Sequence, residues 1–192
     1  MSEARKAFET FIADLREIWR SHGHDEARMS AAREKLRVLT MNPHIQACSR
    51  DWPLTIGQNL LLYEDADFGF VVNAVVRPPD YKGGVHDHAD VWVLYGVIDG
   101  AERLERYVRV DDGAVDGFAE VRRTSETRGQ PGVVDIVPPF EIHAEQGASD
   151  RSAALIVRSR RVVGRVMQNG YDESAKKVTK RWGPEQVRYS LG

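Results

Sequence analysis

The sequence predicts a mainly β protein, a barrel or sandwich of short strands preceded by N-terminal α-helices. Apolar residues recur every three or four positions over the first fifty residues, then at every second position from residue 58 onward. Turn residues interrupt the second region at the spacing typical of sandwiches and barrels rather than of alternating strand and helix units. The 192 residues are therefore expected to form one domain with additions at its ends.

The first fifty residues are expected to be helical and to pack on the barrel. The first helix is predicted by one apolar stripe, formed by Phe8, Phe11, Ile12, Leu15, Ile18 and Trp19. A second helix is expected from Asp25, which can act as its N-cap, and it should end before Pro43 because the residue preceding a proline avoids the α region. A short turn or helical piece over residues 44–49 then leads to the β region.

The barrel is expected over residues 51–168 and a surface tail over residues 169–192. The candidate strands are NLLLYEDAD, FGFVVNAVV, VWVLYGVID, ERLERYVRV, FAEVRRT, VVDIVPP and SAALIVRS. The tail is polar and weakly periodic, so we expect it to wrap the barrel with at most one short element of its own.

Charge and composition exclude several classes of partner. The 27 Lys and Arg nearly balance the 29 Asp and Glu, so no global field favours nucleic acid or an anionic membrane. The single cysteine, Cys48, excludes an intramolecular disulfide and a cysteine-rich metal site, and it is compatible with a reducing compartment. No basic start precedes a long apolar stretch, and we predict a cytoplasmic protein without a membrane partner.

Two of the six histidines lie in a setting that favours metal binding. His22, His24 and His44 fall in connectors and are interpreted as solvated or capping residues. His86 and His88 lie in the strand-like stretch VHDHADVWVLYGVI, where residues two apart share a face. Two adjacent imidazoles suit a divalent transition metal, although a pair of half-exposed strand histidines would have the same spacing.

A second segment, GVVDIVPPFEIHAEQG, could return a third imidazole across the barrel. With this segment included, the chain resembles the cupin superfamily. The residues that match its two motifs are His86, His88, Gly100, Gly132, Pro138 and His143. The resemblance implies a double-stranded β-helix, which is a jelly-roll barrel, and a metal held by the three histidines.

One departure from the cupin pattern narrows the resemblance. Trp92 and Val93 stand where cupins usually carry a glutamate ligand. A three-histidine site without that glutamate resembles the cysteine dioxygenase and 3-mercaptopropionate dioxygenase group. This second resemblance implies iron(II) as cofactor and dioxygen as co-substrate, with zinc, nickel and manganese as alternative metals.

Other features of that group are absent. Its Ser, His, Tyr triad would fall on Ile156, Arg158 and Arg160, or on Leu155, Val157 and Ser159 if the loop is one residue shorter. Its substrate-binding arginine would fall near Asp65. The thiol substrate is therefore not implied for this chain.

An anionic substrate would need a positive counter-charge in the barrel. Arg158 and Arg160 are two apart on one strand, so they share a face that could grip a carboxylate, or else form a solvated rim. Arg77 is a further candidate, although it could equally lie in a surface turn. The aromatic residues that could wall the pocket, or instead pack in the core, are Tyr81, Trp92 and Tyr95.

The function predicted from these residues is an iron-dependent oxygenase acting on a small anionic molecule. Asp90 or Glu141 could orient a metal-bound imidazole, or could be ordinary turn residues. A non-oxidative metal cupin, such as an isomerase or lyase, is the first alternative, and a non-catalytic binding module is the second. A homodimer formed through the barrel edges is possible in each case.

Overall fold

The computed structural model describes residues 2–191, which begin with three α-helices. These are α1 (Glu3–Ser21), α2 (Asp25–Thr40) and α3 (Pro43–Ser49). The Ser2 side chain caps α1, and Asn42 caps α3. Asp25 is the first residue of α2 rather than its N-cap, because His24 takes the extended cap position without a capping side-chain bond.

Two six-stranded sheets follow. The first sheet, named here the helix-covered sheet, has the order β12-β1-β2-β9-β4-β7. Its strands are β1 (Gln58–Glu64), β2 (Val71–Arg77), β4 (Val93–Asp99), β7 (Val134–Val137), β9 (Ser152–Arg158) and β12 (Glu185–Arg188). The second sheet, named the open sheet, has the order β11-β10-β3-β8-β5-β6. Its strands are β3 (Val85–His86), β5 (Glu102–Arg109), β6 (Val121–Gly129), β8 (Ile142–Gly147), β10 (Met167–Asp172) and β11 (Lys177–Trp182).

The strand order defines a jelly roll. Strands β2-β9-β4-β7 lie in one sheet and β3-β8-β5-β6 in the other, so the connections from β2 to β5 and from β6 to β9 alternate between the sheets. Neighbouring strands among these eight are antiparallel. The predicted fold class, a mainly β jelly roll preceded by helices, is confirmed.

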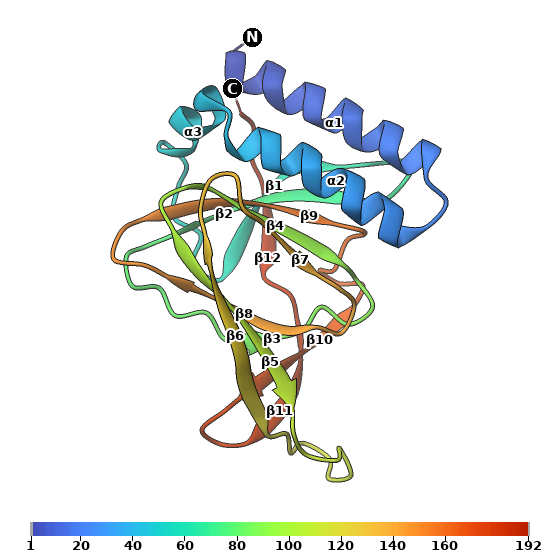
Figure 1. Ribbon diagram of the computed structural model, residues 1–192, viewed down its shortest axis with the longest axis vertical. Helices are drawn as coiled ribbons and strands as arrows, with labels where there is room; N and C mark the ends of the chain where they lie inside the picture. The colour runs from blue at the N-terminus through green and yellow to red at the C-terminus, as the bar shows by residue number, and fades with distance from the viewer. Residues whose placement is uncertain (1, 192) are drawn as a thin grey trace.

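The helices cover the outer face of the helix-covered sheet, as Figure 1 shows. Alternate side chains of β2, β4 and β9 face this layer, among them Val72, Leu94 and Leu155, and all three are fully buried in the main core. The backbone of β4 passes close to α2 at Gly96, where a Cβ atom would lie 2.8 Å from the Thr40 Cγ2 atom. The apolar faces of the helices and of these strands therefore pack together in one buried layer.

The tail departs from its prediction because it contributes three strands rather than one short element at most. Strand β10 pairs with β3, β11 pairs with β10, and β12 pairs with β1 in parallel, so the tail extends both sheets. Strand β11 is exposed along most of its length and therefore lacks the apolar alternation that reveals a strand in a sequence. Among residues 2–191, no helix has the length and apolar character needed to cross a membrane.

Candidate metal centre

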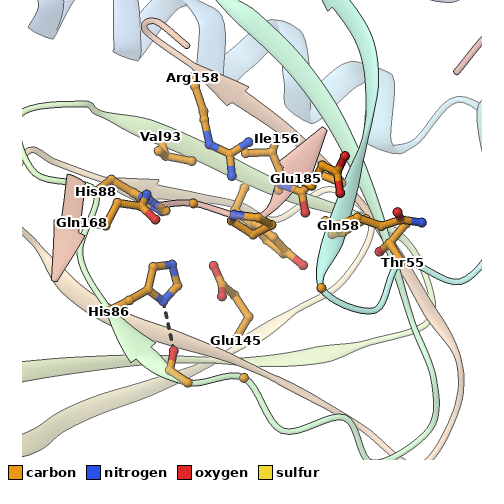
Figure 2. Close-up of a pocket in the computed structure, with 18 of the residues that line it drawn as sticks. Thr55, Gln58, His86, His88, Val93, Glu145, Ile156, Arg158, Gln168 and Glu185 are labelled. Carbon is orange, nitrogen blue, oxygen red and sulfur yellow. Dashed lines mark hydrogen bonds between the residues drawn. The ribbon is translucent and has the colours of Figure 1, made fainter. Parts of the chain in front are cut away.

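A cavity of about 390 Å³ lies between the two sheets. Strands β1, β2, β4 and β9 line it on one side, β3 and β8 on the other, and residues of β10, β11 and β12 complete its wall. Figure 2 shows the guanidinium of Arg158 and the carboxylate of Glu145 pointing into this space from opposite sides. The cavity lies within the size range of small-molecule sites in proteins.

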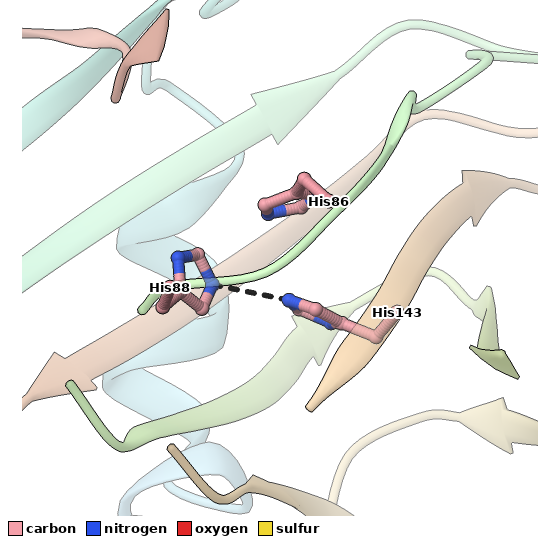
Figure 3. Close-up of side chains that lie close together, drawn as sticks. All are labelled: His86, His88 and His143. Atoms are coloured by element: carbon pink, nitrogen blue, oxygen red, sulfur yellow. Dashed lines mark hydrogen bonds between the residues drawn. The ribbon is translucent and has the colours of Figure 1, made fainter. Parts of the chain in front are cut away.

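The three predicted metal-binding histidines converge beside this cavity, and two of them, His86 and His88, line it. His86 on β3 is the direct antiparallel partner of His143 on β8, and His88 follows β3 by two residues. The nearest ring nitrogens of the three all lie within 4.8 Å of one another. Figure 3 shows the rings turned toward a common centre, with His88 Nε2 lying 3.1 Å from His143 Nε2. This group of donor atoms could hold a metal ion.

The Nδ1 atoms of the three histidines have contacts of their own, so the Nε2 atoms are the candidate metal ligands. Nδ1 of His86 lies 3.0 Å from the carbonyl oxygen of Gly84, which only accepts, so Nδ1 carries the proton. Nδ1 of His143 faces a carboxylate oxygen of Glu145 at 3.4 Å. Nδ1 of His88 lies against the side-chain amide nitrogen of Gln168, and rotation of the amide can bring its oxygen to this atom instead. With the Gln168 oxygen at Nδ1 of His88, each Nε2 atom presents a lone pair to the centre.

The electrostatics of the site favour neutral imidazoles, the form that binds metals. Burial lowers the pKa of all three rings, that of His143 to about 3. The Nε2 atoms of His88 and His143 lie 3.1 Å apart, so they can share one proton in a hydrogen bond or, when both are unprotonated, bind one cation. The donor set therefore fits a divalent transition metal with nitrogen ligands.

Arg158 supplies a buried positive charge beside the histidines. Its side chain extends from the end of β9, and the residue is only 5% exposed. Nη1 donates to the side-chain oxygen of Asn73 at 2.6 Å, whereas Nε is buried without a partner. Within residues 2–191 Arg158 forms no ion pair, and burial lowers its pKa to about 10, so it remains charged near neutrality. Such a group favours an anion in the cavity.

Arg77 also lines the cavity, but carboxylates compensate its charge. It lies 3.5 Å from Glu102 and 3.6 Å from Glu145, and its guanidinium stacks over the ring of Tyr81 at 4.3 Å. The Tyr95 hydroxyl donates to Glu102 at 2.8 Å, and burial raises the Tyr95 pKa well above its usual value. Arg77 is thus buried in the wall of the cavity and does not lie in a surface turn. Tyr81 and Tyr95 line the cavity beside it.

Trp92 and Arg160 do not line the cavity. Trp92 precedes the inward-facing Val93, so the alternation of β4 turns its ring toward the helices, 5.5 Å from the ring of Trp19. Arg160 lies beyond the end of β9 and pairs with Asp90 at the surface. The expectation that Arg160 shares the inward face of Arg158 is therefore corrected, because the strand ends between them.

Asp90 and Glu141 contact arginines rather than imidazoles. The carboxylate of Asp90 is paired with Arg160, and that of Glu141 lies 3.3 Å from Arg106. The partner of His143 is instead Glu145, two residues further along β8. The period of two places His143 and Glu145 on one face, so this neighbour was recognisable from the sequence.

Two further residues at the site could not be predicted from the sequence. Asn73 holds Arg158 from the middle of a valine-rich strand, and Gln168 reaches His88 from the tail. Both contacts join segments about eighty residues apart in the chain. The pairing of β2 with β9 brings Asn73 to Arg158, and the pairing of β3 with β10 brings Gln168 to His88.

The solved structures similar to this chain include cupin and double-stranded β-helix proteins. No family model and no curated protein matches the sequence. The Klebsiella pneumoniae protein with a double-stranded β-helix domain is 15% identical, with a TM-score of 0.42 over 58% of this chain and 80% of that chain. The Schizosaccharomyces pombe Cnp3 cupin domain is 11% identical, with a TM-score of 0.42 over 58% and 71% of the two chains.

The DMSP lyase DddQ of Ruegeria pomeroyi is also similar. It is 15% identical, with a TM-score of 0.36 over 48% of this chain. The matched part spans 39% of the lyase chain, well under half of its length. The finer resemblance to the thiol dioxygenases stays a prediction.

Proposed function

We propose that this chain is a non-haem iron(II) dioxygenase that oxidises a small organic anion. The observation that supports this proposal is a cluster of three neutral, converging imidazoles, two of which line the cavity, together with a buried arginine without an ion-pair partner that lines the same cavity. His86, His88 and His143 would hold the metal. Bound iron(II) would supply redox chemistry with dioxygen and positive charge for a chelating anion, because three neutral ligands leave its 2+ charge uncompensated.

Arg158 would bind and orient the substrate. Its guanidinium points into the cavity (Figure 2) and can donate to a carboxylate oxygen there, while the bond from Nη1 to Asn73 anchors one of its nitrogens. The apolar side chains of Val93 and Ile156 line the same cavity beside the arginine. An anionic group at Arg158 would thus place the rest of a small molecule toward the histidines, and orientation of this kind supplies much of the rate of an enzyme.

Metal analysis and oxygen uptake test this proposal. The protein should purify with iron or bind it after reconstitution, and the iron-loaded protein should consume dioxygen with at least one member of a panel of thiol carboxylates, β-diketones and other small acids. His143→Ala should lose both metal retention and oxygen uptake. Iron retention by His143→Ala at the level of the unaltered protein would contradict the assignment of the site.

A non-oxidative metal lyase or isomerase is the second candidate. Glu145 favours it, because its carboxylate lies in the cavity and could accept a proton from a substrate activated by a metal. Zinc-, nickel- or manganese-loaded protein would then convert a substrate of the same panel without dioxygen. Turnover under anaerobic conditions would favour this candidate, and binding without any turnover would favour a non-catalytic module.

A further inference from the structure

The tail of the chain is built into the metal centre. Strand β10 pairs with β3, with Gly170 opposite His86 and Tyr171 opposite Val85. Strand β3 is only two residues long, and His88 lies outside it, so β10 supports the segment that carries two of the three histidines. We propose that Gln168 on β10 is a positioning residue for His88, and that it fixes this ring for metal binding. The inference rests on the proposed metal site.

Asp87 locks the tail to the histidine segment. Its carboxylate accepts hydrogen bonds from the Asn169 backbone N–H at 3.1 Å, from the Asn169 side chain at 2.7 Å and from the Tyr171 hydroxyl at 3.1 Å. The backbone N–H of Asp87 also donates to the Asn169 carbonyl at 3.1 Å. Asp87 is 2% exposed, so these bonds form away from water and hold the two segments in one register. Gln168 is thereby held beside His88.

Within residues 2–191, the hydrogen-bond partner of the Gln168 side chain is His88. Gln168 is 2% exposed, and the nitrogen of its side-chain amide lies against Nδ1 of His88. The two ends of an amide can exchange by rotation, so its orientation follows the proton on the ring. When Nε2 of His88 binds a metal, Nδ1 carries the proton and donates to the amide oxygen of Gln168. The amide then holds the ring in the orientation that metal binding needs.

Cobalt(II) binding tests the role of Gln168 without any assay of turnover. We expect Gln168→Met, which keeps the length of the side chain but has no strong acceptor, to weaken cobalt(II) binding by about 10- to 100-fold and to shift the visible bands of the bound ion. Gln168→Glu keeps an acceptor and should bind cobalt(II) at least as tightly as the unaltered protein. The matched control is Gln46→Met, which removes an amide bonded to the Thr40 carbonyl in the helical layer and should leave the affinity unchanged.

A second measurement needs no variant. In zinc-loaded protein labelled with ¹⁵N histidine, the His88 ring should carry its proton on Nδ1. A proton on Nε2 would overturn the inference, as would cobalt(II) affinities of Gln168→Met and the unaltered protein that agree within experimental error. Equal losses in Gln168→Met and Gln168→Glu would also overturn it, because packing rather than the acceptor would then matter.

The metal site and the role of Gln168 can fail separately. If the unaltered protein binds no cobalt(II), or if His143→Ala binds it equally well, the proposed function fails and the role of Gln168 fails with it. If the unaltered protein binds and His143→Ala does not, while Gln168→Met matches the unaltered protein, only the role of Gln168 is overturned.

Discussion

The two faces of strands β2, β4 and β9 are both buried, yet they carry opposite chemistry. Toward the helices, the side chains are apolar, as at Val72 and Leu155. Toward the cavity, apolar residues alternate with polar ones, and Asn73 and Arg158 are buried there. On the helix side, burial of apolar area stabilises the fold. On the cavity side, part of that stabilisation is offset by the cost of removing polar groups from water. Burial alone therefore does not distinguish a core from a site.

The largest predicted effect on stability is at Leu155, on the helix side. Leu155→Ala removes a fully buried side chain from the main core and should lower the free energy of unfolding by about 2–5 kcal/mol. Its neighbour Ile156 faces the cavity, so Ile156→Ala adds to a space that is already open and should cost about 2 kcal/mol, the lower end of the same range. Urea unfolding of both variants measures the difference. Equal losses would show that the two faces contribute alike.

On the cavity side, substitution of Arg158 should weaken ligand binding without lowering stability. Arg158→Met removes the buried charge and its bond to Asn73, so we expect anion binding to weaken by about 1.5–3 kcal/mol, roughly 10- to 150-fold in Kd. Stability should be unchanged or higher, because no buried charge remains to be desolvated. Calorimetric titration of cobalt-loaded protein with the carboxylates of the substrate panel measures the first effect. Unchanged affinity for every carboxylate would remove Arg158 from the site.

The sequence predicts the fold and the histidines better than it predicts the rest of the cavity. His86, His88 and His143 lie in motifs of fixed spacing, and period two places them on an inward face. Trp92 follows the same rule, since it precedes the inward-facing Val93 and must turn outward. Gln168 depends on a strand pairing of the tail, and no local pattern in an exposed, polar segment predicts such a pairing.

A smaller effect is expected where a charged contact ties the helical layer to the barrel. The Asp65 carboxylate accepts bonds from Arg16 of α1, from the Tyr63 hydroxyl at 2.9 Å and from the Phe68 backbone N–H at 2.8 Å. Burial alone would raise the pKa of Asp65, but these bonds outweigh it and lower the pKa. Asp65 therefore stabilises the fold above its unfolded pKa, and this contribution is lost as pH falls through the folded pKa.

Asp65→Asn should accordingly destabilise the protein by about 1 kcal/mol near neutral pH, since the amide keeps some of the hydrogen bonds but loses the charge. The difference from the unaltered protein should shrink below about pH 4, where the carboxylate becomes protonated in the unfolded chain and then in the folded one. Urea unfolding at several pH values measures this. A difference that stays constant down to about pH 2.5 would contradict the assigned role of the charge.

The smallest effect is expected at Arg160, which lies beyond the end of β9 and outside the cavity. Arg160 and Arg158 are two apart and would share a face if the strand continued, but β9 ends at Arg158 and Arg160 pairs with Asp90 at the surface. Arg160→Met should therefore change stability by no more than about 0.5 kcal/mol and leave carboxylate binding unaltered, since exposed ion pairs contribute little. The same titration used for Arg158→Met provides the test. A loss of affinity comparable to that of Arg158→Met would mean that the inward face of β9 extends past its last paired residue.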